Sequence, residues 1–216
     1  GLGHIVDVVP NHMSADPVSN LWWRDVLESG PASPFSEFFD VDWDPIKPEL
    51  KDRVLLPVLG DQYGRVLERG ELQLRFEQGT LVVAYGDLTL PIDPRELPRV
   101  LGLDGALVGH ELADNEGGAR EYLSIMTALT NLPARTERHP DGVAVRQREK
   151  EVARERLVRL AEESSGVRAH VDACVRYVNG QPGAAATFDA LHDLLDRQAD
   201  RLAYWRTAFD EINYRR

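Results

Sequence analysis

Apolar positions at the start of the chain predict a strand that is buried on both faces. Residues 4–9 read His-Ile-Val-Asp-Val-Val, a β-branched run with little alternation between apolar and polar positions. Such runs are typical of strands inside parallel sheets, whose neighbours are reached through crossovers of a dozen or more residues. The sequence starts at Gly1 without a methionine and stops at Arg216 without a capping or turn residue. We therefore expect both ends to be cut from a longer chain.

The segment 19–93 predicts a mixture of short helices and strands. The run from Trp22 to Leu27 suits a helix that Ser19 or Asn20 caps and that Gly30-Pro31 closes. Farther along, alternation with period two and a Gln-Gly turn predict a small antiparallel meander. The elements expected after the first helix are a helical turn at 35–40, strands at 39–43 and 54–58, a helix at 61–68, and meander strands at 71–76, 81–85 and 88–92.

From Pro94 onward the pattern predicts helices joined by loops. The expected elements are helices at about 95–101, 120–129, 141–163 and 166–177, a last helix from about Thr187, and a loop rich in Gly and Asp at 102–118. The segment 141–163 is dense in charge and carries few apolar residues, so we expect a mostly solvated helix there. In the last helix, Phe188, Leu191, Leu194 and Leu195 share one face.

The amino-acid composition of the chain disfavours some classes of binding partner. The 216 residues include 25 Lys and Arg against 36 Asp and Glu, a net charge of −11. This balance disfavours nucleic acid and anionic membranes as partners, but it does not repel a neutral polyol. No stretch approaches the ~20 apolar residues of a membrane span. The one cysteine, Cys174, excludes an intramolecular disulfide, suits a reducing, cytoplasmic compartment, and is expected to be a small buried hydrophobe.

Candidate chemistry lies at the carboxyl end of the opening strand, where Asp7 is followed closely by Asn11 and His12. In (β/α)₈ barrels the loops at that end of the strands form the active site. A neutral imidazole donates one hydrogen bond and accepts another, which suits His12 to a sugar hydroxyl. Asn11 could orient a neighbouring loop, and Asp7 could hold the backbone. An isolated histidine more often caps or packs in a loop, but the position after a buried strand favours a functional role for His12.

These residues carry a resemblance to a known family. The stretch DVVPNH from Asp7 to His12 resembles the first conserved region of the α-amylase superfamily, which follows the third barrel strand. Further blocks resemble the maltooligosyl trehalose synthase family: WWRDVLESGPASP at 22–34, FFD at 38–40, LLPVLG at 55–60, REKEV at 148–152, RLAYWR at 201–206 and DEINYRR at 210–216. The likeness spans the chain, although Asp200, Phe209 and the stretch 102–118 depart from the family pattern.

The resemblance implies an α+β fragment of a (β/α)₈ barrel enzyme, with one barrel strand followed by a mostly helical insertion that holds a small antiparallel sheet. The segments would be the third strand and its loop at 1–18, a mixed part at 19–93, a helical part at 94–197 and a return segment at 198–216. The implied reaction is intramolecular transglucosylation, in which the reducing-end α-1,4 bond of a maltooligosaccharide becomes an α,α-1,1 bond.

The resemblance also implies where the functional groups lie. The superfamily's catalytic Asp, Glu and Asp follow the fourth, fifth and seventh strands, so none is expected in this chain, and no metal or cofactor is expected either. His12 matches a histidine that contacts the glucose unit at the scissile bond. The other implied substrate-binding positions are Asp7 and Asn11 beside it, and Tyr204, Trp205, Asn213, Tyr214 and Arg215 near the return to the barrel. The implied partners are a maltooligosaccharide and the remainder of the barrel.

Two other interpretations remain open. The first is another retaining enzyme of the superfamily, a hydrolase or a 4-α-glucanotransferase, that shares only the motif at Asp7 to His12; the blocks after Trp22 argue against it. The second is a non-catalytic helical interaction module, in which the opening strand is incidental. Trp22 and Trp23 are expected to pack in the core under any of these interpretations.

Overall fold

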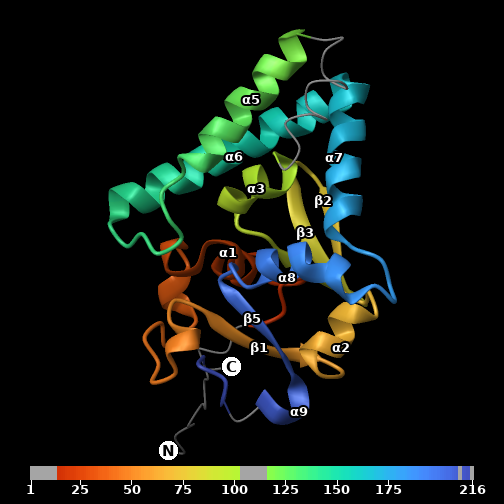
Figure 1. Ribbon diagram of the computed structural model, residues 1–216. Coiled ribbons are helices and arrows are strands. Elements are labelled where there is room, and N and C mark those ends of the chain that lie inside the picture. Colours follow the sequence, from red (N-terminus) through yellow and green to blue (C-terminus); the bar gives the residue numbers. More distant parts are fainter. Residues whose placement is uncertain (1–13, 103–115, 209–210, 215–216) are drawn as a thin grey trace, which may run out of the picture.

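The computed structural model describes residues 14–102, 116–208 and 211–214. It is an α+β structure, in which helices surround a two-stranded sheet and a three-stranded sheet (Figure 1). The expected combination of helices with a small antiparallel sheet is confirmed. The proposed barrel strand at 4–9 lies outside the described residues and stays a prediction.

The first helix, α1 (Leu21–Ser29), forms where the sequence predicts it. The side chain of Asn20 accepts hydrogen bonds from the backbone N–H groups of Trp22 and Trp23, at 3.0 and 3.3 Å, and so caps two of the free donors at the helix start. Gly30 ends the helix with a φ of 56°, which favours glycine. Short 3₁₀ turns follow at η1 (Gly30–Ala32), η2 (Ser36–Phe38) and η3 (Pro48–Leu50).

The expected strand at 39–43 is wrong, because among the described residues this segment makes only an isolated antiparallel bridge, between Val41 and Tyr214. The expected strand at 54–58 is confirmed as β1 (Val54–Leu59). Its partner is a strand that the pattern did not predict, β5 (Asp200–Tyr204), which pairs with β1 in parallel. Helix α2 (Tyr63–Glu68) follows β1, and the short helix α9 (Trp205–Ala208) follows β5.

The antiparallel meander is confirmed as β2 (Gln73–Glu77), β3 (Thr80–Tyr85) and β4 (Leu88–Pro91). The β2–β3 turn lies against the long helix α6 (Pro140–Glu163), so closely that a Cβ added at Gly79 would stand 2.4 Å from the carbonyl oxygen of Arg154. The φ of Gly79 is 74°. Both the backbone angle and the close approach therefore require glycine at this turn.

The helical part contains the expected helices with small shifts at their ends. Helix α5 begins at Glu116, so the last residues of the expected loop at 102–118 belong to this helix. Helices α5 and α6 lie side by side, and α7 runs along the meander (Figure 1). The bounds are η4 (Pro94–Glu96), α3 (Leu97–Leu101), α5 (Glu116–Thr130), α7 (Ser165–Val178), η5 (Ala185–Phe188) and α8 (Asp189–Leu195).

The main hydrophobic core has members from Trp23 in α1 to Tyr214 near the other end of the described chain, and a second, small cluster joins Leu50 and Leu55 to Ala208 of α9. Cys174 is buried and free, as expected. Trp23 is fully buried, but Trp22 is 45% exposed, so the expectation of core packing is wrong for Trp22. Its ring instead stacks on that of Phe35 with centroids 5.0 Å apart.

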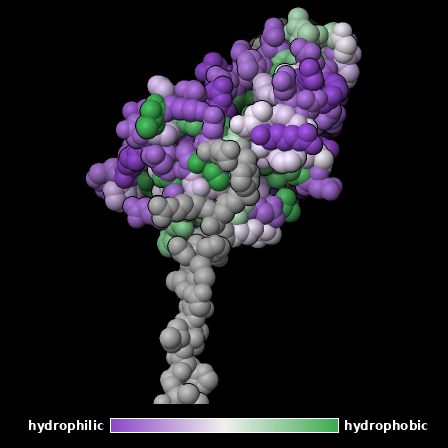
Figure 2. Space-filling view, turned by 90° about the horizontal axis from the view of Figure 1, so that it is seen from below, coloured by the Kyte–Doolittle hydropathy of each residue, from purple (hydrophilic) through white to green (hydrophobic). Residues whose placement is uncertain are grey.

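The surface is mostly polar. Figure 2 views the molecule from below Figure 1, and its visible face is dominated by hydrophilic residues with scattered apolar groups. Among the helices that the structure describes, none is both long enough and apolar enough to cross a membrane.

Candidate functional site

Two predicted site residues, Tyr204 and Trp205, form an exposed aromatic corner at the carboxyl end of β5. Their rings meet edge to face with centroids 6.5 Å apart, and 48% of Trp205 is exposed. The guanidinium of Arg206 lies 5.2 Å from the centre of the Trp205 ring and covers one side of it. Since β1 and β5 are parallel, the carboxyl ends of both strands meet at this corner, with Leu59 opposite Tyr204. Ligands of parallel sheets bind at such ends.

The other described residues of the predicted site are Asn213 and Tyr214. Asn213 forms hydrogen bonds to the backbone, and Tyr214 packs in the core. The Asn213 carboxamide accepts a hydrogen bond from the N–H of Leu55 at 2.9 Å and donates to the carbonyl oxygens of Asp42 and Arg53, at 2.9 and 2.8 Å. The Tyr214 ring is buried against the Trp23 ring, with centroids 5.1 Å apart. Both side chains therefore position the segment beside β1, and this geometry does not present them to a ligand.

The remaining predicted site residues, Asp7, Asn11, His12 and Arg215, lie outside the described residues. Their roles stay predictions that rest on the resemblance of the sequence alone.

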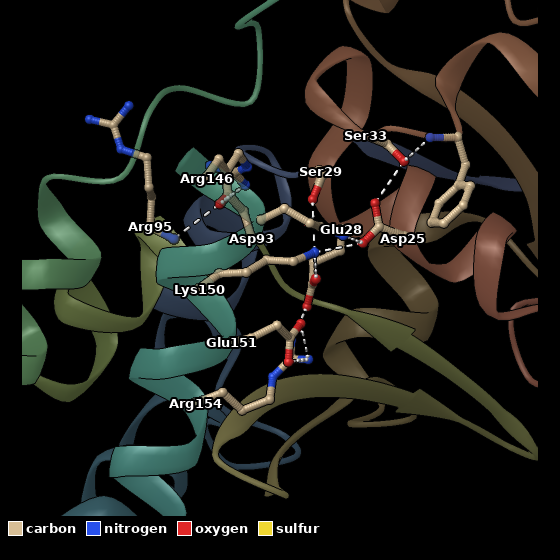
Figure 3. Close-up of polar contacts among 12 residues, drawn as sticks. Asp25, Glu28, Ser29, Ser33, Asp93, Arg95, Arg146, Lys150, Glu151 and Arg154 are labelled. Atoms are coloured by element: carbon tan, nitrogen blue, oxygen red, sulfur yellow. Dashed lines mark hydrogen bonds and ion pairs between the residues drawn. The ribbon is translucent and has the colours of Figure 1, made fainter. Parts of the chain in front are cut away.

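A connected group of charged side chains lies between α1 and α6 (Figure 3), and the sequence analysis did not predict it. Lys150 is 1% exposed, and its ammonium group lies 2.6 Å from a carboxylate oxygen of Asp25 and 2.6 Å from one of Glu28. Arg154 pairs with the other oxygen of Glu28 at 2.6 Å. We call Asp25, Glu28, Lys150 and Arg154 the α1–α6 charge network. Helix α6 is mostly solvated as expected, but the charged residues Arg146 and Lys150 are among its few buried positions.

This network has the electrostatics of a structural ion cluster. Burial alone would raise the pKa of Asp25, but the charge of Lys150 and hydrogen bonds from Gln147, Lys150 and Ser33 outweigh it, so the pKa is lowered. Burial would lower the pKa of Lys150, but the two carboxylates raise it above its ordinary value. A general acid needs a raised carboxyl pKa and a nucleophile needs an open approach. Asp25 does not meet the first condition, and Lys150 and Arg154 pair with oxygens of both carboxylates.

A second buried pair extends the cluster along α6. One guanidinium nitrogen of Arg146 lies 2.7 Å from the carboxylate of Asp93, and another donates to the carbonyl oxygen of Pro133 at 2.7 Å. The backbone N–H of Asp93 in turn donates to the side chain of Gln198, which precedes β5. Polar and charged side chains thereby connect α1, α6, η4 and the residues that precede β5.

Asp200 is a buried carboxyl group with one oxygen that lacks a hydrogen-bond partner among the described residues. It is 4% exposed, and this oxygen is Oδ1. Burial raises the pKa of Asp200 to about 7, although a backbone hydrogen bond and the charges of Arg135 and Arg53 act in the other direction. It opens β5 at the position where the sequence departs from the family pattern.

Among several concave sites of the described surface, two that contain aromatic side chains were not indicated by the sequence. One is a cavity of about 130 Å³, where the Tyr63 hydroxyl lies 3.0 Å from Nδ1 of His192 and Arg53 pairs with Asp196. The other is a groove of about 580 Å³ lined by Trp43. No signal in the sequence singles out Trp43, because its groove forms from segments far apart along the chain. Within the described ranges no three His, Cys, Asp or Glu side chains gather as metal ligands would.

Comparison with known proteins agrees with the sequence resemblance. The chain is similar to two curated proteins named putative maltooligosyl trehalose synthase, from Mycobacterium tuberculosis strains CDC 1551 / Oshkosh and ATCC 25618 / H37Rv. Each is 42% identical over 96 residues, which cover 44% of this chain and 11% of the relative. The matched part thus spans about a tenth of the length of these relatives. No family model matches the chain, and no solved structure matches it. The resemblance to this kind of protein is confirmed over the matched stretch.

Proposed function

We propose that this chain is part of an intramolecular transglucosylase that converts the reducing-end α-1,4 bond of maltooligosaccharides into an α,α-1,1 bond. The observation that carries the proposal is the 42% identity, over 96 residues, to proteins named for maltooligosyl trehalose synthesis. The geometry supports it, because two blocks that resemble this family, at 22–34 and 148–152, meet in the α1–α6 charge network. Residues of this kind are expected together where they maintain a family's fold.

Within that enzyme the chain would stand beside the reaction centre without supplying the reacting carboxyl groups. Retaining glycoside chemistry needs two carboxyl groups about 5–5.5 Å apart, one as nucleophile and one as acid and then base. Asp25 and Glu28 are both held by Lys150 and do not serve this purpose. On the resemblance, the catalytic Asp, Glu and Asp lie outside this chain, His12 contacts the sugar at the scissile bond, and Asp7 and Asn11 support His12.

The aromatic corner gives the chain a role in choosing transfer over hydrolysis. A covalent glycosyl-enzyme intermediate can be taken by water or by a hydroxyl group of the released glucose. Transfer wins when the glucose is held at high effective concentration and water is excluded. Trp205 has an exposed ring face of the kind that stacks on sugars, and Tyr204 and Arg206 fix its orientation. Asn213 and Tyr214 would position the neighbouring segment, and Arg215 would donate to a sugar hydroxyl.

The proposal is tested by the products of the longer enzyme acting on maltopentaose. Wild type should form a non-reducing α,α-1,1 product, measured by chromatography, with little glucose. Trp205→Ala and Trp205→Phe should raise free glucose relative to that product, while total turnover falls less than this ratio does. Tyr177→Ala, which removes an exposed ring on α7, is the control and should leave the ratio unchanged.

Three outcomes would contradict parts of the proposal. A wild-type enzyme that forms no α,α-1,1 product would refute the function itself. A fixed product ratio together with a lower melting temperature would make Trp205 a packing residue. Turnover of maltopentaose by the 216-residue chain alone, if it persists through purification, would refute the assignment of the catalytic carboxyl groups to other parts of the enzyme.

A further inference from the structure

The groove lined by Trp43 combines an aromatic ring with side chains that can form hydrogen bonds to hydroxyl groups. It has a volume of about 580 Å³, within the ~300–1,000 Å³ of pockets that hold small ligands. One side is the segment from Pro31 to Trp43, and the other is Arg138 with the start of α6. The polar side chains that line it are Ser33, Ser36, Glu37, Asp40 and Arg138, and the apolar ones are Pro31, Pro34, Val41, Trp43, Pro140 and Val143.

Trp43 and Arg138 are held in place by the same residue, Asp52. The Trp43 ring packs against the core on one side while it lines the groove on the other. The backbone N–H of Asp52 donates to the carbonyl oxygen of Trp43 at 2.9 Å, and its carboxylate accepts from the Arg138 guanidinium at 2.9 Å. A further arginine, Arg135, donates to the carbonyl oxygen of Asp52. One residue therefore contacts both the backbone of Trp43 and the guanidinium of Arg138, and such prior positioning reduces the entropic cost of binding.

The Ser33 end of the Pro31–Trp43 segment is fixed by the α1–α6 charge network. The Ser33 hydroxyl donates to Asp25 at 2.6 Å and accepts from the backbone N–H of Phe35 at 3.1 Å (Figure 3). Asp25 is in turn paired with Lys150. The Pro31–Trp43 side of the groove is therefore tied to a buried ion pair, and the Arg138 side to the partly exposed pair with Asp52, as expected of a preformed site.

The side chains in the groove favour a neutral, hydroxyl-rich ligand. An indole face offers an apolar platform, and carboxylate and guanidinium groups accept from and donate to hydroxyls. Glu37 and Asp40 outnumber Arg138, and the whole chain carries a charge of −11, so an anion would be repelled. We propose that this groove binds a segment of an α-1,4-glucan, with one sugar ring on Trp43 and its hydroxyls on Glu37, Asp40 and Arg138.

This inference rests on the proposed function for the identity of the sugar, but it concerns binding and needs no turnover. The aromatic corner at Trp205 lies on a different part of the chain and does not line the groove. A second glucan contact would keep a long substrate near the enzyme after one reaction cycle, because two linked contacts raise the effective concentration of the chain.

The test is calorimetric titration of the 216-residue chain with maltoheptaose. Wild type should bind, and Trp43→Ala should weaken binding about tenfold, equivalent to ~1.4 kcal/mol. Trp43→Phe keeps an aromatic platform and should restore most of the affinity. Ser36→Trp places a large side chain in the groove without touching the core and should abolish binding. Tyr177→Ala, an exposed ring on α7, is the control and should bind as wild type does. Circular dichroism confirms that each variant is folded.

Several results would overturn the proposal. Absence of binding by wild type would do so, as would undiminished binding by Ser36→Trp. Maltoheptaose binding that is unchanged in Trp43→Ala would also do so, because the sugar would then lie elsewhere on the chain. Binding of maltoheptaose that depends on Trp43, in a chain whose longer enzyme forms no α,α-1,1 product, would refute the proposed function and leave this inference standing.

Discussion

Asn213 and Asp200 are two polar residues at the same small sheet with opposite hydrogen-bonding outcomes. Asn213 makes three hydrogen bonds to the backbone at one edge of β1, so its burial there is compensated. Asp200 opens β5 and leaves Oδ1 without a partner in the described part of the chain. A carboxyl group in this situation is stable in its neutral form, because burial penalises the charge. The two residues show that a polar side chain beside β1 is stabilising only where the backbone supplies matching groups.

Asp200→Asn should therefore stabilise the protein in a pH-dependent way. The pKa of Asp200 is about 7 in the folded state and about 3.9 in an unfolded chain, so the folded state binds the proton more tightly. Wild type then loses stability as pH rises from about 4 to about 7, by up to ~4 kcal/mol, and the loss is complete above pH 7. The stability gain of the variant should be absent near pH 4 and largest near pH 8.

Denaturant unfolding at several pH values measures this difference. Asp44→Asn, which changes a carboxylate with 80% of its side chain exposed, is the control and should show no such trend. A stability gain that is equal at pH 4 and pH 8 would mean that Asp200 is not the titrating group. A loss of stability at pH 8 would mean that its ionised form is compensated in the fold.

At the scale of elements, the contact between α1 and α6 depends on charge as much as on apolar packing. Lys150 lies between Asp25 and Glu28 with almost no exposure. Removing one member of a buried ion pair leaves an uncompensated charge and costs roughly 3–5 kcal/mol. We expect Lys150→Met to destabilise the chain by about this amount. Arg148→Ala, on the exposed side of the same helix, should change stability by less than about 0.5 kcal/mol.

Urea unfolding of the two variants checks this expectation. The triple variant Lys150→Met, Asp25→Asn, Glu28→Gln should recover part of the loss, because no buried charge then stands alone. Equal stability of Lys150→Met and Arg148→Ala would show that solvent reaches the network and that it contributes little.

The local sequence pattern was sufficient to predict those elements that neighbouring residues specify. The cap at Asn20, the turn at Gln78-Gly79 and the apolar face of α8 are each specified by neighbouring residues, and these elements form as predicted. Strand β5 was missed because its partner β1 is far away in sequence and its residues do not alternate clearly. The burial of Lys150 was missed for the same reason, since a charged run acquires a buried face only when distant carboxylates meet it.

The candidate site likewise contains residues that the sequence could identify and contacts that depend on tertiary structure. Tyr204 and Trp205 could be selected from the sequence because a family-like block contains them, and the structure leaves Trp205 exposed. Asn213 was selected by the same means, but its hydrogen bonds to Leu55, Asp42 and Arg53 depend on tertiary placement that no local pattern shows. The groove at Trp43 depends wholly on such placement.

At the scale of the whole molecule, the main core and one set of ion pairs unite segments from both ends of the described chain. The core includes Trp23 of α1 and Tyr214, and the Asp93–Arg146 pair reaches toward β5 through Gln198. The meander and the helical part lie between β1 and β5 in the sequence (Figure 1). The parallel pair therefore closes a loop that contains most of the protein.

That closure determines the order in which the chain can fold. Contacts between neighbouring segments form early, whereas a parallel pairing of distant strands must first overcome the entropy of closing the intervening loop. The β2–β3–β4 meander should therefore gain structure before β5 docks on β1. In pulsed hydrogen exchange during refolding, amides of β3 should be protected first and those of residues 200–204 last. Because the aromatic corner follows β5 directly, a sugar-binding surface at Trp205 would be the last part of the molecule to be assembled, and simultaneous protection of both strands would contradict this order.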